Sequence, residues 1–395
     1  MKIGSFSRDV WAIILFSGVS SLSFGIFMTT WQLYLKSAGY TGEIIGLYNL
    51  ISGLIMTVFV VPAGIIADKS GRRRFLFVGS LLFAASTILI VAFIGVSYLV
   101  CSALLSGLGW ASIQPSINAL MADKAGDRMD SAYSASSFAS GICMAAGSLL
   151  GWIPETLVSK GWTYFKAYRL MTLLAGLVQL ATFFIVFLIG EAKASCTRRI
   201  SFGRIRANPI LLRLFFLSTL IGFGAGLSIP LFSYYFSVKF GVESGPIGTL
   251  YMIINVAGSF LYLTAAPLSR RLGLLKGIVL PQAASVPLLA LIPYSKSFVA
   301  ASILYICRTG LMNMANPLIQ ALYMNISHPE DRATVTAFSS ICWGLPNSVS
   351  SQIGGILMDK ALDLPVLLTA AFYAAYVILF YFLLEEKQLK SNLNV

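Results

Sequence analysis

The chain has 395 residues, of which 57% are hydrophobic and only 11% are charged, and its mean hydropathy is +0.82. A soluble protein of this length is about a quarter charged, so the composition excludes a water-soluble globular protein and indicates a chain embedded in a bilayer. The formal net charge is +13 at pH 7. A strongly basic chain raises the question of nucleic-acid binding, and the positions of the basic residues answer it.

The apolar segments are long enough to cross a membrane, because a helix needs about 20 apolar residues to do so. The first run follows Lys2 and Arg8 but has no small-residue cleavage site, so we expect a retained helix rather than a signal peptide. Breaks at charged residues and at Gly, Pro and Asn clusters leave twelve runs, and the fold class is therefore an all-α integral membrane protein. The predicted spans are 10–36, 42–67, 75–95, 98–122, 131–154, 167–190, 209–237, 246–268, 275–294, 298–324, 333–358 and 364–384.

The basic residues are distributed unevenly between the two sides of this arrangement. If the N-terminus is cytoplasmic, 20 of the 28 Lys and Arg residues fall in cytoplasmic segments, seven fall outside, and Arg308 alone lies within a span. This bias predicts that both termini lie in the cytoplasm. It also accounts for the high net charge, so we expect a multi-pass protein of the cell membrane that contacts lipid and binds no nucleic acid.

Groups that would hold a metal or perform catalysis are not clustered in the sequence. The five cysteines are irregularly spaced without a CxxC pair, and the single histidine, His328, stands beside a proline in a loop. No nucleotide-binding loop is present, and all 15 acidic residues fall in loops or at helix ends. We therefore expect no metal, no cofactor and no enzymatic activity.

The two halves of the chain resemble each other at a nearly constant offset. Gly39 and Gly241, Gly46 and Gly248, Gly71 and Gly273, and Pro115 and Pro317 are each 202 residues apart. Several matches at one offset indicate a duplicated six-helix unit. Two such parallel halves enclose a binding site near the middle of the bilayer in many transporters.

The longest internal polar segment separates these halves. We expect an N-terminal six-helix bundle over residues 1–190, a basic cytoplasmic linker over 191–208 and a C-terminal six-helix bundle over 209–395. The linker carries five basic residues and one acid. Either it lies on anionic headgroups, or it regulates the protein or binds a partner.

The loop between the second and third spans reads "GIIADKSGRRR" over residues 64–74. It resembles the signature loop of the major facilitator superfamily, G-x-x-x-D-[RK]-x-G-[RK]-[RK], in the position that this family places it. Every fixed position matches, and the matching residues are Gly64, Asp68, Lys69, Gly71, Arg72 and Arg73. The resemblance covers the whole chain and implies two pseudo-symmetric six-helix bundles that alternate in access.

By this resemblance, the loop is a conformational latch in which Arg72 pairs with Asp123 and Asp68 faces the start of the eleventh helix. The copy in the second half is degenerate, since Arg270 stands where the first has Asp68. A second family motif in the fourth span lacks its arginine, and Ala103 occupies that place. This absence argues against the proton-coupling scheme that the family associates with that arginine.

Two helices carry polar residues at every fourth position, so each set shares one face. In this family the fourth and tenth helices line the central cavity, so these residues are substrate-cavity candidates. Trp31 and Gln32 in the first span are weaker candidates. The first stripe is Ser106, Trp110, Gln114 and Asn118, and the second stripe, 202 residues later, is Arg308, Met312, Asn316 and Gln320.

The stripes have two interpretations, contact with a ligand or hydrogen bonding between helices. An arginine within a span costs about 2.5 kcal/mol or more, which favours a functional role for Arg308. It either pairs with an anionic group of the substrate or binds helix carbonyls. No carboxylate lies near the middle of a span, and Glu43 is the nearest candidate for a proton carrier.

The resemblance and the stripes together predict a secondary active or facilitative transporter of a small organic solute. In one version of this prediction, the solute carries an anionic group that Arg308 binds. A lipophilic drug exporter is the alternative, and a non-transporting membrane sensor on the same fold is an alternative of another class. The expected partners are the lipid bilayer, a small-molecule substrate and, in the secondary active version, a coupling ion. We expect the protein to act as a monomer.

Overall fold

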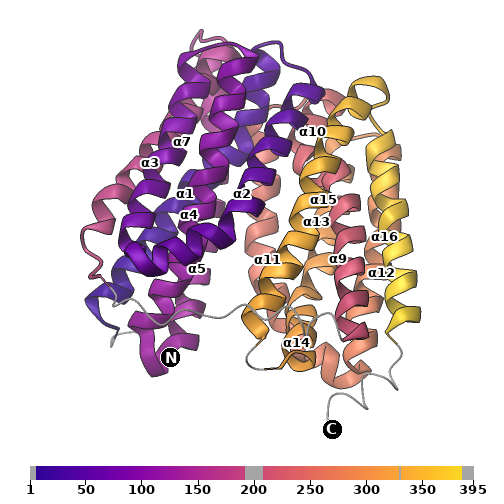
Figure 1. Ribbon diagram of the computed structural model, residues 1–395. Coiled ribbons are helices and arrows are strands. Elements are labelled where there is room, and N and C mark those ends of the chain that lie inside the picture. Colours follow the sequence, from indigo (N-terminus) through magenta and orange to yellow (C-terminus); the bar gives the residue numbers. More distant parts are fainter. Residues whose placement is uncertain (1–5, 192–207, 329–330, 385–395) are drawn as a thin grey trace. The chain divides into compact units, whose positions relative to one another are not determined.

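The computed structural model describes residues 6–191, 208–328 and 331–384, with residues 127, 259–271 and 333 described by their backbone alone. Over these ranges every regular element is helical (Figure 1). Most of the predicted linker, residues 192–207, lies outside the described residues. The expected all-helical fold is confirmed.

Six helical crossings occupy the first half of the described chain. They are α1 (Arg8–Ser37), α2 (Gly42–Ser70), α3 (Arg72–Ala92), α4 (Val96–Ala125), then after η2 (Gly126–Arg128) the run of α5 (Met129–Leu149), η3 (Leu150–Trp152) and α6 (Ile153–Val158), and α7 (Tyr164–Val186). The fifth crossing consists of three consecutive segments, α5, η3 and α6.

Six more crossings follow in the second half. They are α9 (Pro209–Ser228) with η4 (Ile229–Leu231) and α10 (Phe232–Phe240), α11 (Ser244–Leu272), α12 (Leu274–Leu291) with η5 (Ile292–Tyr294), α13 (Phe298–Met314) with α14 (Asn316–Ile326), α15 (Arg332–Lys360), and α16 (Leu364–Leu383). Among the described residues, ten crossings are long and apolar enough to span a membrane. The other two, α11 and α15, are 29 residues each, which exceeds the length a bilayer requires.

Prolines lie where four of the spans that the sequence predicts as continuous divide. Pro154, Pro230, Pro293 and Pro317 each lie in the first turn of a new helical segment, namely α6, η4, η5 and α14. A proline fits the first turn because the N–H that it lacks would have no partner there in any case. Pro115, the counterpart of Pro317, lies inside α4 without interrupting it.

Polar side chains start several helices at positions close to the predicted boundaries. Ser7 caps α1 by accepting from the Val10 N–H, and Ser297 caps α13 in the same way. Asn208 accepts from two N–H groups at the start of α9. Such caps satisfy amide groups that have no partner within the helix.

The described chain divides into two compact units, which we treat separately. Unit 1 comprises Met1–Thr197 with Ser233–Val256, and unit 2 comprises Arg198–Phe232 with Ala257–Val395. The predicted division into bundles over 1–190 and 209–395 remains a prediction.

Helices in unit 1 approach each other through glycine. α1 packs along α5 and α7, while α4 packs along α2 and α3. A Cβ atom added at Gly25 would collide with the Met144 carbonyl oxygen, and one added at Gly147 would collide with that of Leu22. Gly25 and Gly147 therefore allow α1 and α5 to pack closely.

Unit 2 uses the same means of packing. α9 lies along α15 and α16. A Cβ atom at Gly226 would collide with the Asn347 carbonyl oxygen, and one at Gly354 with that of Leu227. The turn glycines of the two halves also agree, because Gly71 has φ 108° and Gly273, 202 residues later, has φ 82°. Both lie in the left-handed region that favours glycine.

Candidate functional site

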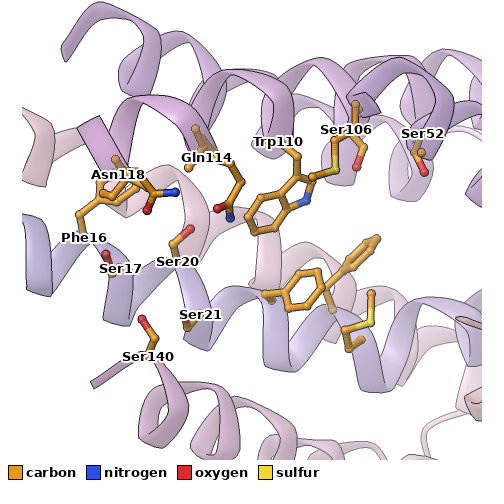
Figure 2. Close-up of a pocket in the computed structure, with 18 of the residues that line it drawn as sticks. Phe16, Ser17, Ser20, Ser21, Ser52, Ser106, Trp110, Gln114, Asn118 and Ser140 are labelled. Carbon is orange, nitrogen blue, oxygen red and sulfur yellow. The ribbon is translucent and has the colours of Figure 1, made fainter. Parts of the chain in front are cut away.

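A cavity of about 560 Å³ lies within unit 1, between α1, α2, α4 and α5 (Figure 2). This volume falls within the range of small-molecule sites, roughly 300–1,000 Å³. All four residues of the first stripe line it, and so does Trp31 from α1. Figure 2 shows Trp110 and Gln114 projecting from α4 toward the side of the cavity formed by α1.

Sequence reasoning missed most of the hydroxyl groups in this cavity. Ser17, Ser20 and Ser21 line it from α1. The neighbouring helix α5, which packs along α1, contributes three more serines. Serines at positions i, i+3 and i+4 share a helix face, so the pattern at 17, 20 and 21 was a usable signal. The lining serines of α5 are Ser136, Ser137 and Ser140.

Aromatic rings form the second component of the lining. Trp110 contacts Phe24 edge to face, with ring centroids 5.2 Å apart and an interplanar angle of 82°. Trp31 stacks on Phe27 at 5.5 Å and lies against Tyr48 at 4.8 Å. These edge-to-face and stacked contacts hold the ring faces in fixed orientations around the cavity.

Several polar side chains in the lining have no hydrogen-bond partner among the described residues. They include the amides of Gln114 and Asn118 from the first stripe. The Trp31 Nε1–H and the Asn49 side-chain nitrogen are buried without a partner in the same part of the chain. Buried polar groups are nearly always paired, so the Trp31 and Asn49 atoms are exceptions, whereas the half-buried Gln114 and the exposed Asn118 have amides that are open to a solute. The unpaired hydroxyls are those of Ser17, Ser21, Ser106, Ser136, Ser137 and Ser140.

The predicted latch residues come together at one end of unit 1. The Arg72 guanidinium forms an ion pair with Asp68, with Nε 2.7 Å from Oδ1, and a short ion pair with Asp123. Arg72 also donates to the Ala119 carbonyl oxygen, and it is 8% exposed. This network joins the end of α2, the start of α3 and the end of α4.

The remaining loop residues have different surroundings. Lys69 is exposed, and the Arg73 guanidinium carbon lies 5.5 Å from the centroid of the Phe187 ring. A Cβ atom at Gly64 would lie 3.5 Å from Pro115 on α4, which is ordinary van der Waals contact. The predicted contact of Asp68 with the start of the eleventh helix concerns the other unit and remains a prediction.

Arg308 is buried in unit 2, with an exposed fraction of 4%. Its guanidinium carbon lies 5.1 Å from the centroid of Tyr373 on α16 and 6.0 Å from that of Tyr305 on α13. Its Nε has no hydrogen-bond partner, and none of the carboxylates in the described ranges pairs with it. The two rings stabilise the cation in part, by about 0.5–2 kcal/mol for each well-placed ring.

The rest of the second stripe does not form one surface with Arg308. Met312 is buried, and its sulfur accepts a hydrogen bond from Ser285. Asn316 and Gln320 lie on α14, beyond the break at Ala315, and both are exposed. Gln32 is buried outside the cavity lining, where its side-chain oxygen accepts from the Tyr234 backbone N–H at 2.9 Å.

Solved structures with this fold are transporters of different solutes. The nucleoside transporter NupG superposes with a TM-score of 0.78 at 12% identity, over 95% of this chain and 98% of that one. A D-xylose-proton symporter gives 0.75 at 13% identity, over 97% and 99%. A bacterial homologue of the human lysosomal transporter Spinster gives 0.70 at 13%, over 95% of each. At these identities the likeness concerns the fold alone.

Sequence comparison adds a local match and a family. The quinolone resistance protein NorA of Staphylococcus aureus (strain N315) is 28% identical over 102 residues, so the match spans 26% of this chain and 26% of that relative. The sequence profile of the Major Facilitator Superfamily matches residues 13–351, which is most of the chain. The protein is therefore a member of the Major Facilitator Superfamily.

Proposed function

We propose that this protein moves a small organic solute across the cell membrane by alternating access, as a monomer with both termini in the cytoplasm. Its membership of this family supports a multi-pass membrane transporter. The observation that carries the proposal is the cavity of unit 1, because it combines an adequate volume with polar groups that have no partner. Such groups gain hydrogen bonds when a solute enters.

Uptake by proteoliposomes tests this function. Purified full-length protein would be screened by thermal shift against metabolite and drug panels, and the stabilising compounds would then be measured as radiolabelled substrates. Saturable uptake or counterflow is expected with protein-containing vesicles and not with empty ones. A sensor on the same fold would bind a compound without any flux, and that result would contradict the transport proposal.

An anionic substrate is the finer version of this proposal. Arg308 supports it, because a buried cation without a carboxylate partner among the described residues is complementary to an acidic group. Dependence of uptake on a proton gradient or on a sodium gradient would identify the coupling ion.

Drug export is the second candidate. It is favoured by the local identity with NorA and by the aromatic rings in the cavity. Everted vesicles that accumulate a fluoroquinolone on energisation would support export, whereas saturable transport of metabolites with no effect of quinolones would count against it.

A further inference from the structure

The lining of the unit 1 cavity has a composition that restricts what it can hold. All 25 lining residues are uncharged, although the surrounding helices carry charged residues at their ends. Eight of the 25 are serines, and three are Asn or Gln. Seven more are aromatic, among them Trp31 and Trp110. Hydroxyl, amide and ring faces therefore surround one space.

We propose that this cavity binds an uncharged ring-bearing part of the transported solute, which has one apolar face and several hydroxyl or carbonyl groups. The proposal rests on the proposed transport function and names the chemical class of the substrate. It concerns only the part of the solute that lies in the unit 1 cavity, whereas Arg308 belongs to unit 2.

The absence of charge in the lining argues against an ionised group in this space. A charge that leaves water loses most of its hydration and must regain it from a counter-charge or from many oriented dipoles. Among the residues that line the cavity, none is a carboxylate, an ammonium or a guanidinium group. An acid or a lipophilic cation would therefore bind here less tightly than its neutral analogue.

The rings supply a surface for a flat apolar face. The indole of Trp110 is held edge to face by Phe24, at 5.2 Å, and by Phe83, at 5.4 Å. Because its position is fixed by two neighbours, it loses little freedom when a solute ring packs against it. Aromatic pairs of this kind contribute more to binding than the burial of their area alone.

The unpaired polar groups specify the rest of the solute. Hydroxyl and amide groups both donate and accept, so they match hydroxyls and carbonyls. The amides of the half-buried Gln114 and the exposed Asn118 are open to a solute, and their N–H groups can donate to an acceptor oxygen. A purely lipophilic solute would remove water from these groups and leave them unpaired, so it should bind less tightly than a solute with hydroxyl or carbonyl groups.

A matched set of probes tests the charge restriction directly. Isothermal titration calorimetry on the purified full-length protein would compare 4-nitrophenyl β-D-glucoside, 4-nitrophenyl β-D-glucuronide and ethidium. The first two have nearly the same shape and differ by a carboxylate on the sugar ring. We expect the glucoside to bind at least about tenfold more tightly than the glucuronide, because one desolvated charge exceeds about 1.4 kcal/mol.

Two variants connect this binding to the cavity. Gln114→Leu keeps the approximate volume and removes the amide, so it should weaken glucoside binding about fivefold. Trp110→Leu removes the ring face and should weaken it about tenfold. Trp11→Leu is the matched control, because Trp11 is 43% exposed on α1 and does not line the cavity.

Each outcome decides the matter. The proposal is overturned if the glucuronide or ethidium binds as tightly as the glucoside, if none of the three binds, or if both cavity variants bind like wild type. If only the transport proposal is wrong, no solute shows flux, but the glucoside still binds more tightly than the glucuronide. Flux of other solutes together with a lost preference overturns this inference alone.

Discussion

The first and second stripes occupy equivalent positions in a duplicated chain, yet their surroundings differ. Every residue of the first stripe lines one cavity, along an α4 that continues through Pro115. The second stripe is divided by the break before Pro317, so that Arg308 and Met312 are buried on α13 while the two later residues are exposed on α14.

The two units are alike in how their long helices pack and differ in the polar residues that these helices carry. In both units a pair of long helices packs through glycines that tolerate no Cβ atom. Close approach of two helix backbones is therefore a means of packing that both units share. The polar residues of the stripes have less influence on packing, and they have diverged until one stripe is neutral and the other holds a buried cation.

The largest expected effect comes from breaking the shared packing. Gly147→Leu in unit 1 and Gly354→Leu in unit 2 both place side-chain atoms where a carbonyl oxygen of the neighbouring helix lies. Because the colliding atoms are backbone, the helices must separate, at a cost above the 1–3 kcal/mol of ordinary overpacking. We expect both variants to lose the monodisperse peak in fluorescence-detected size-exclusion chromatography.

Gly258→Leu is the control for this pair. Gly258 also lies within a long helix, but a Cβ atom there would meet no described atom within 4 Å. Its elution profile should match that of wild type. Normal profiles for Gly147→Leu and Gly354→Leu would show that the close helix contacts are not required for folding.

The sequence was sufficient to predict what depends on composition and local pattern. The lengths of the apolar runs predicted the helical crossings, and the 202-residue offset predicted a duplicated unit. The polar residues at every fourth position of α4 predicted four residues that line the cavity. The break before Pro317 was not predictable from spacing, since Pro115 leaves its helix continuous. Whether a proline interrupts a helix depends on whether neighbouring groups satisfy the freed carbonyl, and that is a tertiary property.

Gln32 shows a second limit of the sequence. It stands next to Trp31, but adjacent residues on a helix point about 100° apart, so only one of the two lines the cavity. The serines of α5 were missed for another reason, because serine is common in membrane helices as a packing residue and its presence alone does not indicate a cavity. Their role follows from the position of α5 across the cavity from α4.

Arg308→Gln sharpens the comparison between the stripes. If Arg308 binds an acidic group, the variant should weaken binding of benzoate and succinate about tenfold, which is the usual value of a charged hydrogen bond. Binding of 4-nitrophenyl β-D-glucoside should stay within about twofold of wild type. Isothermal titration calorimetry on the variant and on wild type measures both affinities.

Arg308→Lys is the control, because it keeps the charge near Tyr305 and Tyr373. It should retain part of the affinity for acids. An equal loss for acids and for the glucoside, or a lower unfolding temperature in both variants, would instead assign Arg308 to packing between α13 and α16.

The smallest expected effect concerns the loop where the two halves differ most in charge. Asp68→Asn removes one of the two ion pairs of Arg72 and keeps the shape of the side chain. The Asp68 side chain is 43% exposed, so solvent weakens its ion pair and the loss is about 1 kcal/mol or less. Since Asp123 still holds Arg72, we expect normal insertion and an uptake rate about threefold lower.

Lys160→Gln provides the matched control, because it removes a charge at an exposed position outside the loop and without a described ion pair. Its uptake rate should equal that of wild type. The second half has Arg270 in place of Asp68, so charge reversal at this position is compatible with folding of a six-helix unit. A reduced rate in Asp68→Asn alone would therefore assign the carboxylate to the transport cycle, whereas equal rates in both variants would leave the loop with a role in orientation only.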